Sequence, residues 1–568
     1  MHSDDSAEAL VRGNVLMSQT ADVMEKIVAL CRRRGFIFGS SEIYGGIGGF
    51  WDYGPLGCEL KRNIKDAWWY DNVRNPPPGP NGREYQMVGV DCSIIMNPKV
   101  WEASGHVGGF KDPMQTCRQC KKHLRADQVW DGIKDSEWCK SLGELYKAKG
   151  IVTGVDLKKW AETKGRKLAP GLALVRNPSV TLCWMAERVE AKGSAINPID
   201  IIQYAATEQF EQTGLVTPCP HCGGDLTEPR EFNLMFESHA GAVKDEANKV
   251  YLRPETAQGI FVNFPNVMSS TRVKIPFGIA QIGKAFRNEI NPRNYTFRSR
   301  EFEQMEIEFF CKPDESMMWY EFWRDARIKW YESLGIKSDK LRPRQQGKEE
   351  LAHYSKACTD IEYLFPFSDE PQELEGVAHR GSFDLNQHGE HAKGDKYAFA
   401  VFDDELWERE KGKFSAEEAK AAKGKEPYTY VPHVIEPSAG ADRFTLAVIC
   451  EAYSYEETRA SPEFMKFHPR LAPIKAAVFP LVAKDGLPEI AEPIYREIKK
   501  QFLCQYDAKQ SIGKRYARMD EAGTPFCFTI DGQTKEDGTL TVRDRNDASQ
   551  IRIDKSRCLE YLHEQLRL

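Results

Sequence analysis

The chain has 568 residues, of which 41% are hydrophobic and 29% are charged, and its formal net charge is −6. This length favours roughly three to four domains and excludes a single small binding module. The acidic balance excludes a protein that coats nucleic acid by bulk charge, so any nucleic-acid contact must come from local basic patches. No apolar run approaches the roughly 18 residues that a membrane span needs, and the acidic start of the chain does not resemble a secretory signal. We therefore expect a cytoplasmic protein without membrane contact.

Two helices are predicted near the N-terminus. In the first, over residues 20–34, apolar residues recur at helical spacing between Met24 and Cys31, and Gly35 can end the helix. The second runs from about Leu56 to Trp69. The proline-rich run at 75–82 then predicts a loop.

A change of composition marks residues 111–231, which begin and end with Cys-x-x-Cys pairs. The pairs are Cys117 with Cys120 and Cys219 with Cys222, and 98 residues separate them. This separation is longer than in ordinary zinc ribbons, so spacing alone is a weak indication. Two glycines after the second pair give it the tight turn of a zinc knuckle. The two alternatives are a four-cysteine structural zinc site and four free thiols.

The densest chemistry lies in residues 283–310, within a stretch from 250 to 310 that we predict to form strands. Arg287 and Glu289 should project together from one strand, because side chains alternate along a strand. The returning strand is predicted to present one polar face, made of Arg298, Arg300, Phe302, Gln304 and Glu306, opposite an apolar face of Met305, Ile307 and Phe309. Guanidinium groups bind phosphate oxygens, and a phenylalanine ring can stack on a purine. The alternative is an ordinary hairpin with cross-strand ion pairs.

Two further segments complete the organisation. Residues 435–446 predict a buried strand, a turn of small residues and a helix that opens at Asp442 and Arg443. By itself, this pattern is more often only a strand-to-helix turn. From Ile474 onward, strands and helices alternate as in a small α/β domain.

Taken together, these segments resemble a known family. The run Phe286-Arg287-Asn288-Glu289, a loop and Arg298-x-x-x-Phe302 resemble the second signature motif of class II aminoacyl-tRNA synthetases. Gly440-x-x-Arg443 resembles the third motif, and the helix at 56–69 takes the place of the first. Three stretches are similar to the dimeric, single-chain glycyl-tRNA synthetases: 101–113 (WEASGHVGGFKDP), 253–259 (RPETAQG) and 436–440 (EPSAG). The resemblance runs from about Gln19 to the C-terminus.

The resemblance implies an α/β (α+β) architecture. The class II core, an antiparallel sheet flanked by helices, would occupy residues 1–110 and 232–471, interrupted by a zinc-bearing insertion at 111–231. An α/β anticodon-binding domain would follow at 472–568. The resemblance also implies a homodimer that uses ATP and Mg²⁺ to attach glycine to tRNA(Gly), with structural Zn²⁺ held by the four cysteines.

The resemblance assigns roles to particular residues. Arg287 would bind the α-phosphate of ATP, while Arg298 and Arg443 would hold the triphosphate tail. Phe302 and Arg443 would sandwich the adenine, and Glu289 would lie near the adenine and the tRNA end. The three arginines and Glu289 are the predicted catalytic residues. The full predicted ATP site consists of Arg287, Asn288, Glu289, Phe297, Arg298, Phe302, Glu373, Leu374, Gly440 and Arg443. Glu373 and Glu436 would contact magnesium or substrate.

Glycine has no side chain, so a pocket can recognise only its ammonium and carboxylate groups and must exclude a methyl group. The resemblance assigns the ammonium to Glu255, Glu436 and Ser438, and a substrate contact to Arg125. For these residues the alternative is a surface ion pair. The predicted glycine site is completed by Phe302, Gln304, Glu306 and Gly440.

The C-terminal stretches 507–525 and 541–553 are similar to the family's anticodon-binding domain. Cationic and aromatic side chains there are predicted to contact tRNA phosphates and bases: Lys514, Arg515, Tyr516, Arg518, Arg543 and Arg545. The alternative at each position is a solvated basic face.

A function of another class also fits this fold, namely a catalytically silent relative that binds RNA. The joint presence of the three arginines, Glu289 and Phe302 favours the enzyme. Synthesis of diadenosine polyphosphates from the same adenylate would be a side activity of the same site.

Overall fold

The computed structural model describes residues 22–129, 132–133, 136, 219–222, 224, 226–351, 355–393 and 399–566. The chain forms two compact units. The first consists of Met1–Ser104, Phe236–Arg287 and Pro292–Leu568, and the second of Gly105–Met235 and Asn288–Asn291. None of the helices in the described part of the chain combines the length and the apolar character that crossing a membrane requires.

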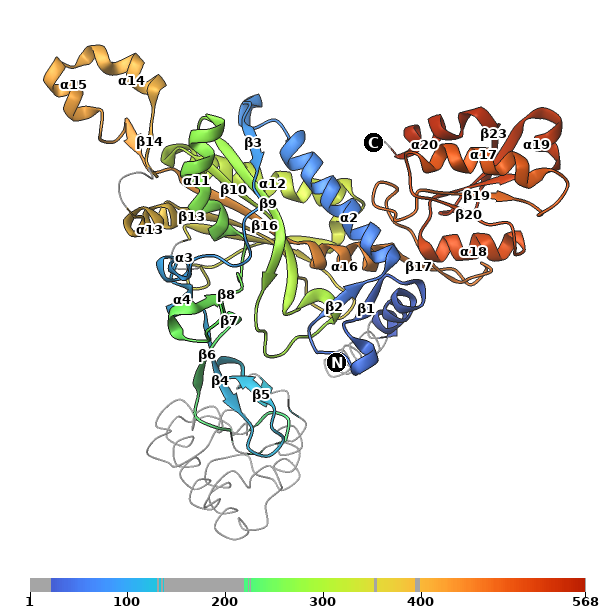
Figure 1. Cartoon of the computed structure of the whole chain (residues 1–568), viewed down its shortest axis with the longest axis horizontal. Coiled ribbons are helices and arrows are strands. Elements are labelled where there is room, and N and C mark those ends of the chain that lie inside the picture. Colours follow the sequence, from blue (N-terminus) through green and yellow to red (C-terminus); the bar gives the residue numbers. More distant parts are fainter. Residues whose placement is uncertain are drawn as a thin grey trace, which may run out of the picture. The chain divides into compact units, whose positions relative to one another are not determined.

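A seven-stranded sheet is the centre of the first unit, in the order β11-β12-β13-β16-β10-β9-β3 (Figure 1). In chain order, its strands are β3 (Gln86–Gly89), β9 (Phe277–Phe286), β10 (Glu301–Cys311), β11 (Leu341–Gln345), β12 (Ala357–Tyr363), β13 (Gln372–Gly381) and β16 (His433–Gly440). Neighbouring strands are antiparallel except β3 and β9, which pair in parallel. The predicted antiparallel core sheet is thus confirmed.

Helices cover both faces of this sheet. The β10 residues Met305, Ile307 and Phe309 pack into the main core. The helices that contribute to that core include the one over residues 22–34, α2 (Pro55–Trp69), α12 (Ser316–Ser333) and α16 (Ala441–Ala452). Phe310 instead packs with α11 (Ala257–Thr271) and α13 (Phe383–His391). Because side chains alternate along a strand, the even-numbered polar residues of β10 lie on the same face as α11 and α13.

The predicted hairpin is present, but its strands stop short of the turn. β9 ends at Phe286 and β10 begins at Glu301, so Arg287 and Arg298 lie in the connecting segment rather than on strands. A short 3-10 helix, η8 (Tyr295–Phe297), directly precedes Arg298. Both arginines are therefore held by turn geometry and not by the pleat of the sheet.

The prediction of strands throughout 250–310 is wrong for residues 257–271, which form α11. The helix is favoured because its apolar residues have helical spacing and one buried face, made of Ala257, Ile260, Phe261, Phe264 and Val267. The high content of Phe, Ile and Val in this stretch obscured that period.

The N-terminal elements contact the segment that connects β9 and β10, where the Tyr295 hydroxyl donates to the Ile37 carbonyl at 3.2 Å. A helix over residues 22–34 ends at Gly35, whose φ of 76° lies in the left-handed region. It leads into β1 (Ile37–Gly39), which pairs antiparallel with β2 (Trp51–Tyr53).

The C-terminal part of the first unit has a sheet of its own, in the order β20-β19-β21-β22-β23 (Figure 1). Its strands are β19 (Ala476–Pro480), β20 (Cys504–Tyr506), β21 (Phe526–Ile530), β22 (Thr539–Asp544) and β23 (Gln550–Asp554). The accompanying helices are α17 (Leu487–Lys499), α18 (Ile512–Ala522), α19 (Gly532–Asp537) and α20 (Cys558–Leu566). A separate hydrophobic core joins α17 and α20 to this sheet. The predicted C-terminal α/β domain is thus confirmed.

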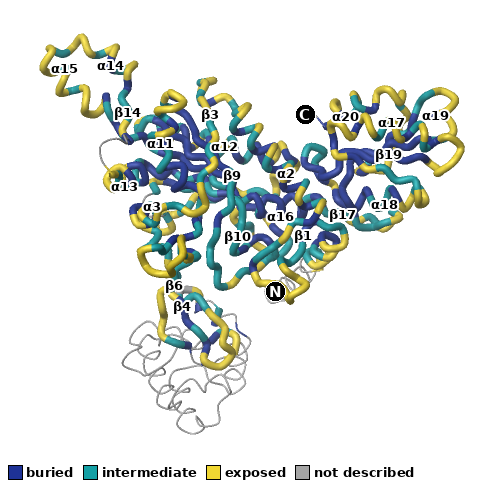
Figure 2. Tube along the Cα trace, viewed as in Figure 1, coloured by how far each residue is buried: buried dark blue, intermediate teal, exposed yellow. Residues whose placement is uncertain are grey.

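An excursion between β13 and β16 contains β14 (Val401–Phe402), α14 (Asp404–Glu410), α15 (Ala416–Ala422) and β15 (Thr429–Tyr430). No residue of α15 is buried, and Figure 2 shows both helices largely exposed.

The second unit contains a three-stranded sheet in the order β5-β4-β6. Its strands are β4 (Lys111–Thr116), β5 (His123–Arg125) and β6 (Arg230–Asn233), and α4 (His106–Gly109) precedes them.

Candidate active site

A row of polar side chains on β10 faces the neighbouring strand β16. Glu306 lies opposite Ser438, and Gln304 lies opposite Gly440. The Ser438 hydroxyl donates to Glu306 Oε1 at 2.7 Å, and the Thr256 hydroxyl also donates to the Glu306 carboxylate. Strand register and two hydroxyl donors thus fix a buried carboxylate in one orientation.

Glu308, two residues further along β10, belongs to the same row although the sequence analysis missed it. Carboxylate oxygens of Glu306, Glu308 and Glu436 all lie within 4.8 Å of one another. Glu308 is completely buried, and neither of its oxygens has a hydrogen-bond partner among the described residues. Burial raises the pKa of Glu308 well above its usual range. The strand alternation that identified Gln304 and Glu306 would also have identified Glu308.

Arg380 supplies positive charge to this carboxylate cluster. Its Nη1 donates to Glu436 Oε2 at 2.6 Å, and its Nε and Nη2 donate to Asp384 at 2.8 and 2.9 Å. Burial, opposed by Arg380 and reinforced by nearby carboxylates, raises the pKa of Glu436 to about 8. The cluster therefore holds more acidic groups than its buried guanidinium can neutralise, which makes it suited to binding a further cation.

Glu255 is tied to the same network through α11. Gln258 Nε2 donates to Glu255 Oε1 at 3.1 Å and to Asp384 Oδ1 at 3.0 Å. Arg253, two residues before Glu255 in the same motif, is buried, and its Nη1 donates to the Cys92 carbonyl at 2.7 Å. A Cβ atom at Gly283 would lie only 2.2 Å from Arg253 Nη2, so the close approach of the guanidinium requires glycine there.

Three predicted phosphate-binding arginines act on one carboxylate, that of Glu373 near the start of β13. The Arg287 guanidinium lies 5.4 Å from the centre of the Phe302 ring, and its Nε donates to the Pro254 carbonyl at 3.0 Å. Arg443 Nη1 lies 3.3 Å from Glu373 Oε1. Attraction by Arg443, with smaller contributions from Arg287 and Arg298, lowers the pKa of Glu373. The structure thus brings the three arginines into one electrostatic environment.

Arg443 itself is positioned by the start of α16. The preceding residue, Asp442, accepts from Lys61 Nζ at 2.7 Å, from the Tyr53 hydroxyl at 2.6 Å and from the Glu303 N–H at 2.6 Å. Arg443 lies over the ring of Phe297, 4.7 Å from its centre, rather than over Phe302. The predicted adenine sandwich between Phe302 and Arg443 stays a prediction.

The contacts described so far do not include every predicted site residue. Leu374 is buried in the main core, so its side chain serves packing. Arg125, Asn288 and Glu289 belong to the second unit. There, Arg125 Nη1 lies 3.4 Å from Asp112 Oδ2, and the Asn288 N–H donates to the Leu234 carbonyl at 2.7 Å. Substrate contacts by these three residues stay predictions.

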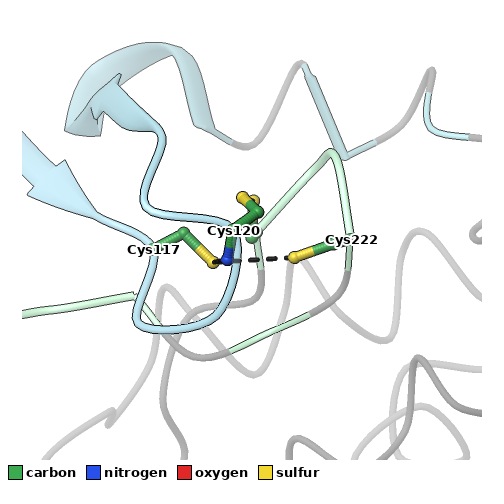
Figure 3. A group of neighbouring side chains, drawn as sticks. Cys117, Cys120 and Cys222 are labelled. Carbon is green, nitrogen blue, oxygen red and sulfur yellow. Dashed lines mark hydrogen bonds between the residues drawn. The ribbon is translucent and has the colours of Figure 1, made fainter.

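The two Cys-x-x-Cys pairs meet in the second unit, and Figure 3 shows Cys117, Cys120 and Cys222 close together. Sulfur atoms of all four cysteines lie within 4.8 Å of one another. The Cys117–Cys222 and Cys120–Cys219 separations are 3.6 and 3.7 Å. Four thiolates about 2.3 Å from a tetrahedral zinc would be roughly 3.8 Å apart, so this donor set fits the metal.

Comparisons with known proteins show which family the chain resembles. Residues 236–453 match the family model described as the tRNA synthetase class II core domain (G, H, P, S and T). A protein named glycine–tRNA ligase from Rhodopirellula baltica is 48% identical over 549 residues, which covers 93% of this chain and 97% of that protein. The glycine–tRNA ligase of Geobacillus thermodenitrificans is 45% identical over 94% of this chain and 95% of its own length.

The chain belongs to the glycine–tRNA ligase family. A second family model, described as the anticodon binding domain, matches residues 475–565, which run from β19 into α20.

In this C-terminal domain, three of the arginines predicted to contact tRNA are buried. They are Arg515, Arg543 and Arg545. Arg515 Nη1 donates to the Pro480 carbonyl at 2.7 Å, and Arg545 Nη1 donates to the Gly523 carbonyl at 2.6 Å. Arg543 forms two hydrogen bonds with Asp520, at 2.8 and 2.9 Å. A phosphate could reach these groups only by displacing internal partners, so their burial argues for a structural role instead of the predicted tRNA contact.

The other predicted tRNA residues are more accessible. Lys514 is exposed on α18, and Arg518 is half-buried and pairs with Asp507. The Tyr516 hydroxyl contacts Thr529 Oγ1 at 2.5 Å. Their tRNA contacts stay predictions.

Proposed function

We propose that the chain ligates glycine to tRNA(Gly) in two steps. A carboxylate oxygen of glycine attacks the α-phosphorus of ATP, which forms glycyl-adenylate and releases pyrophosphate. A hydroxyl of the terminal ribose of the tRNA then attacks the glycyl carbonyl carbon, and AMP leaves. The close similarity to proteins named glycine–tRNA ligase over nearly the whole chain carries this proposal.

The carboxylate cluster supports glycine as the amino acid. Glu306, Glu308 and Glu436 are buried together near Arg380, so an ammonium group would offset an excess of acidic groups. Ser438 offers a further polar contact beside Glu306. Such a pocket would bind the amino group without needing a side chain, and its walls could exclude larger amino acids sterically.

Arg287, Arg298 and Arg443 would carry the first step. Attack on phosphorus needs alignment and neutralisation of phosphate charge more than it needs a proton-transfer base. Magnesium would neutralise phosphate charge when bound with ATP, and Glu373 and Glu436 are the residues proposed to hold it. Glu373 suits this role well because the arginines keep its carboxylate ionised.

The remaining proposals concern assembly and compartment. The four cysteines would bind one structural zinc ion, the enzyme would act as a homodimer, and the reaction would take place in the cytoplasm. Sedimentation of the purified protein would test the dimer.

The deciding experiment is exchange of labelled pyrophosphate into ATP, which reports adenylate formation without tRNA. Exchange should depend on glycine, and alanine or serine at the same concentration should support little of it. A catalytically silent RNA-binding relative would show no exchange with any amino acid, which would overturn the proposal.

A further inference from the structure

Three large apolar side chains are exposed together on the loop between β1 and β2. Ile43 and Tyr44 are each 87% exposed and Ile47 is 55% exposed, and the first two exceed every other large apolar residue in the described part of the chain. We call these three residues the apolar tip. Exposed apolar groups that cluster in this way mark an interaction surface more often than singly scattered ones do.

The loop that carries the apolar tip is held in shape. Ser41, Gly45, Gly46 and Gly49 all have φ in the left-handed region, and for Ser41 this conformation is unfavourable. Glu42 accepts from the Gly39 N–H at 3.1 Å and pairs with Arg32 at 2.9 Å. The outward orientation of the apolar side chains is therefore built into the fold.

The loop is also joined to the turn of the hairpin that carries Arg287 and Arg298. The Arg300 N–H donates to the Gly49 carbonyl and Arg300 Nη1 donates to the Gly48 carbonyl, both at 2.8 Å. A Cβ atom at Gly49 would lie 2.7 Å from Pro292 Cβ, so the backbone of Gly49 packs directly against the Pro292 ring. The apolar tip thus borders the segment that the proposed function places at the adenylate.

The surroundings of the apolar tip are cationic at the hairpin's turn. Arg293 is exposed there, and Arg32, whose side chain is 68% exposed, pairs with Glu42 of the loop. An aromatic ring beside arginines is the usual platform for unpaired bases, because bases stack on the ring and phosphates pair with the guanidinium groups. A stable protein interface would need about 800 Å² from each partner, which favours a smaller occupant for three side chains.

We propose that the apolar tip binds the single-stranded 3′ end of tRNA, with Tyr44 stacked on one of its bases. This inference rests on the proposed function, because that function requires the tRNA end to reach the adenylate beside the hairpin. Tyr44 would act as a binding residue for the second step and would take no part in the first.

The test compares Tyr44→Ala with Tyr44→Phe, which keeps the ring, and with Tyr455→Ala as a control. Tyr455 is 59% exposed on β17 (Tyr453–Tyr455). Glycine-dependent pyrophosphate exchange should be unchanged in all three variants, which also shows that each is folded. The kcat/KM for tRNA in charging should fall about 10-fold in Tyr44→Ala alone, the size expected for loss of one stacked base. A hairpin RNA that contains only the acceptor stem and 3′ end should show the same loss.

Three outcomes would overturn the inference. Unchanged charging in Tyr44→Ala would show that no base stacks there, and an equal loss of exchange would give Tyr44 a role in the core. A change in sedimentation of Tyr44→Ala would make the apolar tip a contact between copies of the chain. Absence of glycine-dependent exchange in the wild type would contradict the proposed function itself, so the two failures are distinguishable.

Discussion

The ring of Phe302 lies beside the guanidinium of Arg287 at the start of β10. If adenine stacks on this ring, Phe302→Ala should weaken ATP binding by about 1 to 3 kcal/mol, the usual range for a stacked base. Equilibrium titration with ATP would measure the loss. Phe322→Ala, at a half-buried phenylalanine of α12, is the control and should bind ATP normally. Normal ATP binding by Phe302→Ala would remove the ring from the adenine site.

The buried carboxylates make stability depend on pH. The pKa of Glu436 is raised to about 8, so between about pH 5 and 8 the folded protein binds more protons than the unfolded chain. The free energy of unfolding contributed by this cluster should therefore fall as pH rises through that window. In Glu436→Gln and Glu308→Gln, the fall in the free energy of unfolding across this pH window should be smaller by a few kcal/mol. Urea denaturation at several pH values would measure it.

The exposed Glu332→Gln serves as the control, because it should leave the slope unchanged. Saturating glycine should stabilise the wild type more at pH 8 than at pH 6, since the ionised cluster attracts the ammonium group. Equal slopes in the wild type and both cluster variants would show that the carboxylates stay ionised throughout.

The sequence predicts a site residue when strand alternation or a motif places it. It does not predict a residue that reaches the site only because the chain folds. Gln304 and Glu306 follow from the period of two along β10, and Glu308 could have been added by the same rule. Arg380 could not, because it reaches Glu436 from β13, 56 positions away in the chain. Its local sequence gives no sign that its partners are buried carboxylates.

The two Cys-x-x-Cys pairs allow the zinc proposal to be tested directly. Purified protein should contain about one zinc ion per chain, and Cys219→Ser should lose it because a tetrahedral thiolate site needs all four ligands. Metal analysis by mass spectrometry would measure the occupancy. Cys58→Ser, at an exposed thiol of α2, should retain the metal. Full activity and thermal stability in metal-free protein would mark the cysteines as ordinary thiols.

Two elements show why burial is harder to predict than composition. The stretch that forms α11 is rich in strand-favouring residues, yet packing of its periodic apolar face decides for a helix. In the C-terminal domain, the resemblance to an anticodon-binding domain and its cationic side chains predicted a tRNA surface. Arg515 and Arg545 instead point inward, because backbone carbonyls can satisfy a buried guanidinium as well as a phosphate can.

At the scale of the whole molecule, the catalytic sheet and the C-terminal sheet have separate hydrophobic cores. A chain that ends after Pro473 should therefore keep pyrophosphate exchange within about threefold of the wild type. Charging should fall by about 100-fold or more, since tRNA would lose one of two linked binding surfaces. Parallel exchange and charging assays would measure the two steps.

The salt dependence of the two reaction steps independently tests whether charging needs the C-terminal domain more than exchange does. Charging by the intact chain should weaken more steeply with salt than exchange does, because phosphate contacts release counterions. The domains are also joined by ion pairs, such as Arg33 and Arg34 with Glu521. An equal loss of exchange and charging in folded, truncated protein would show that these contacts support the catalytic core.

The parallel pairing of β3 with β9 has a consequence for the order of synthesis. β3 ends at Gly89 and its partner begins at Phe277, with the second unit's longer segment between them. At about 5 to 20 residues per second, β3 leaves the ribosome roughly 10 to 40 seconds before β9 exists. Nascent chains arrested ahead of Phe277 should thus be cleaved readily by protease near β3, and protection should arise only once β9 has emerged. The order of these segments in the chain therefore delays pairing at this edge of the catalytic sheet until most of the second unit has been synthesised.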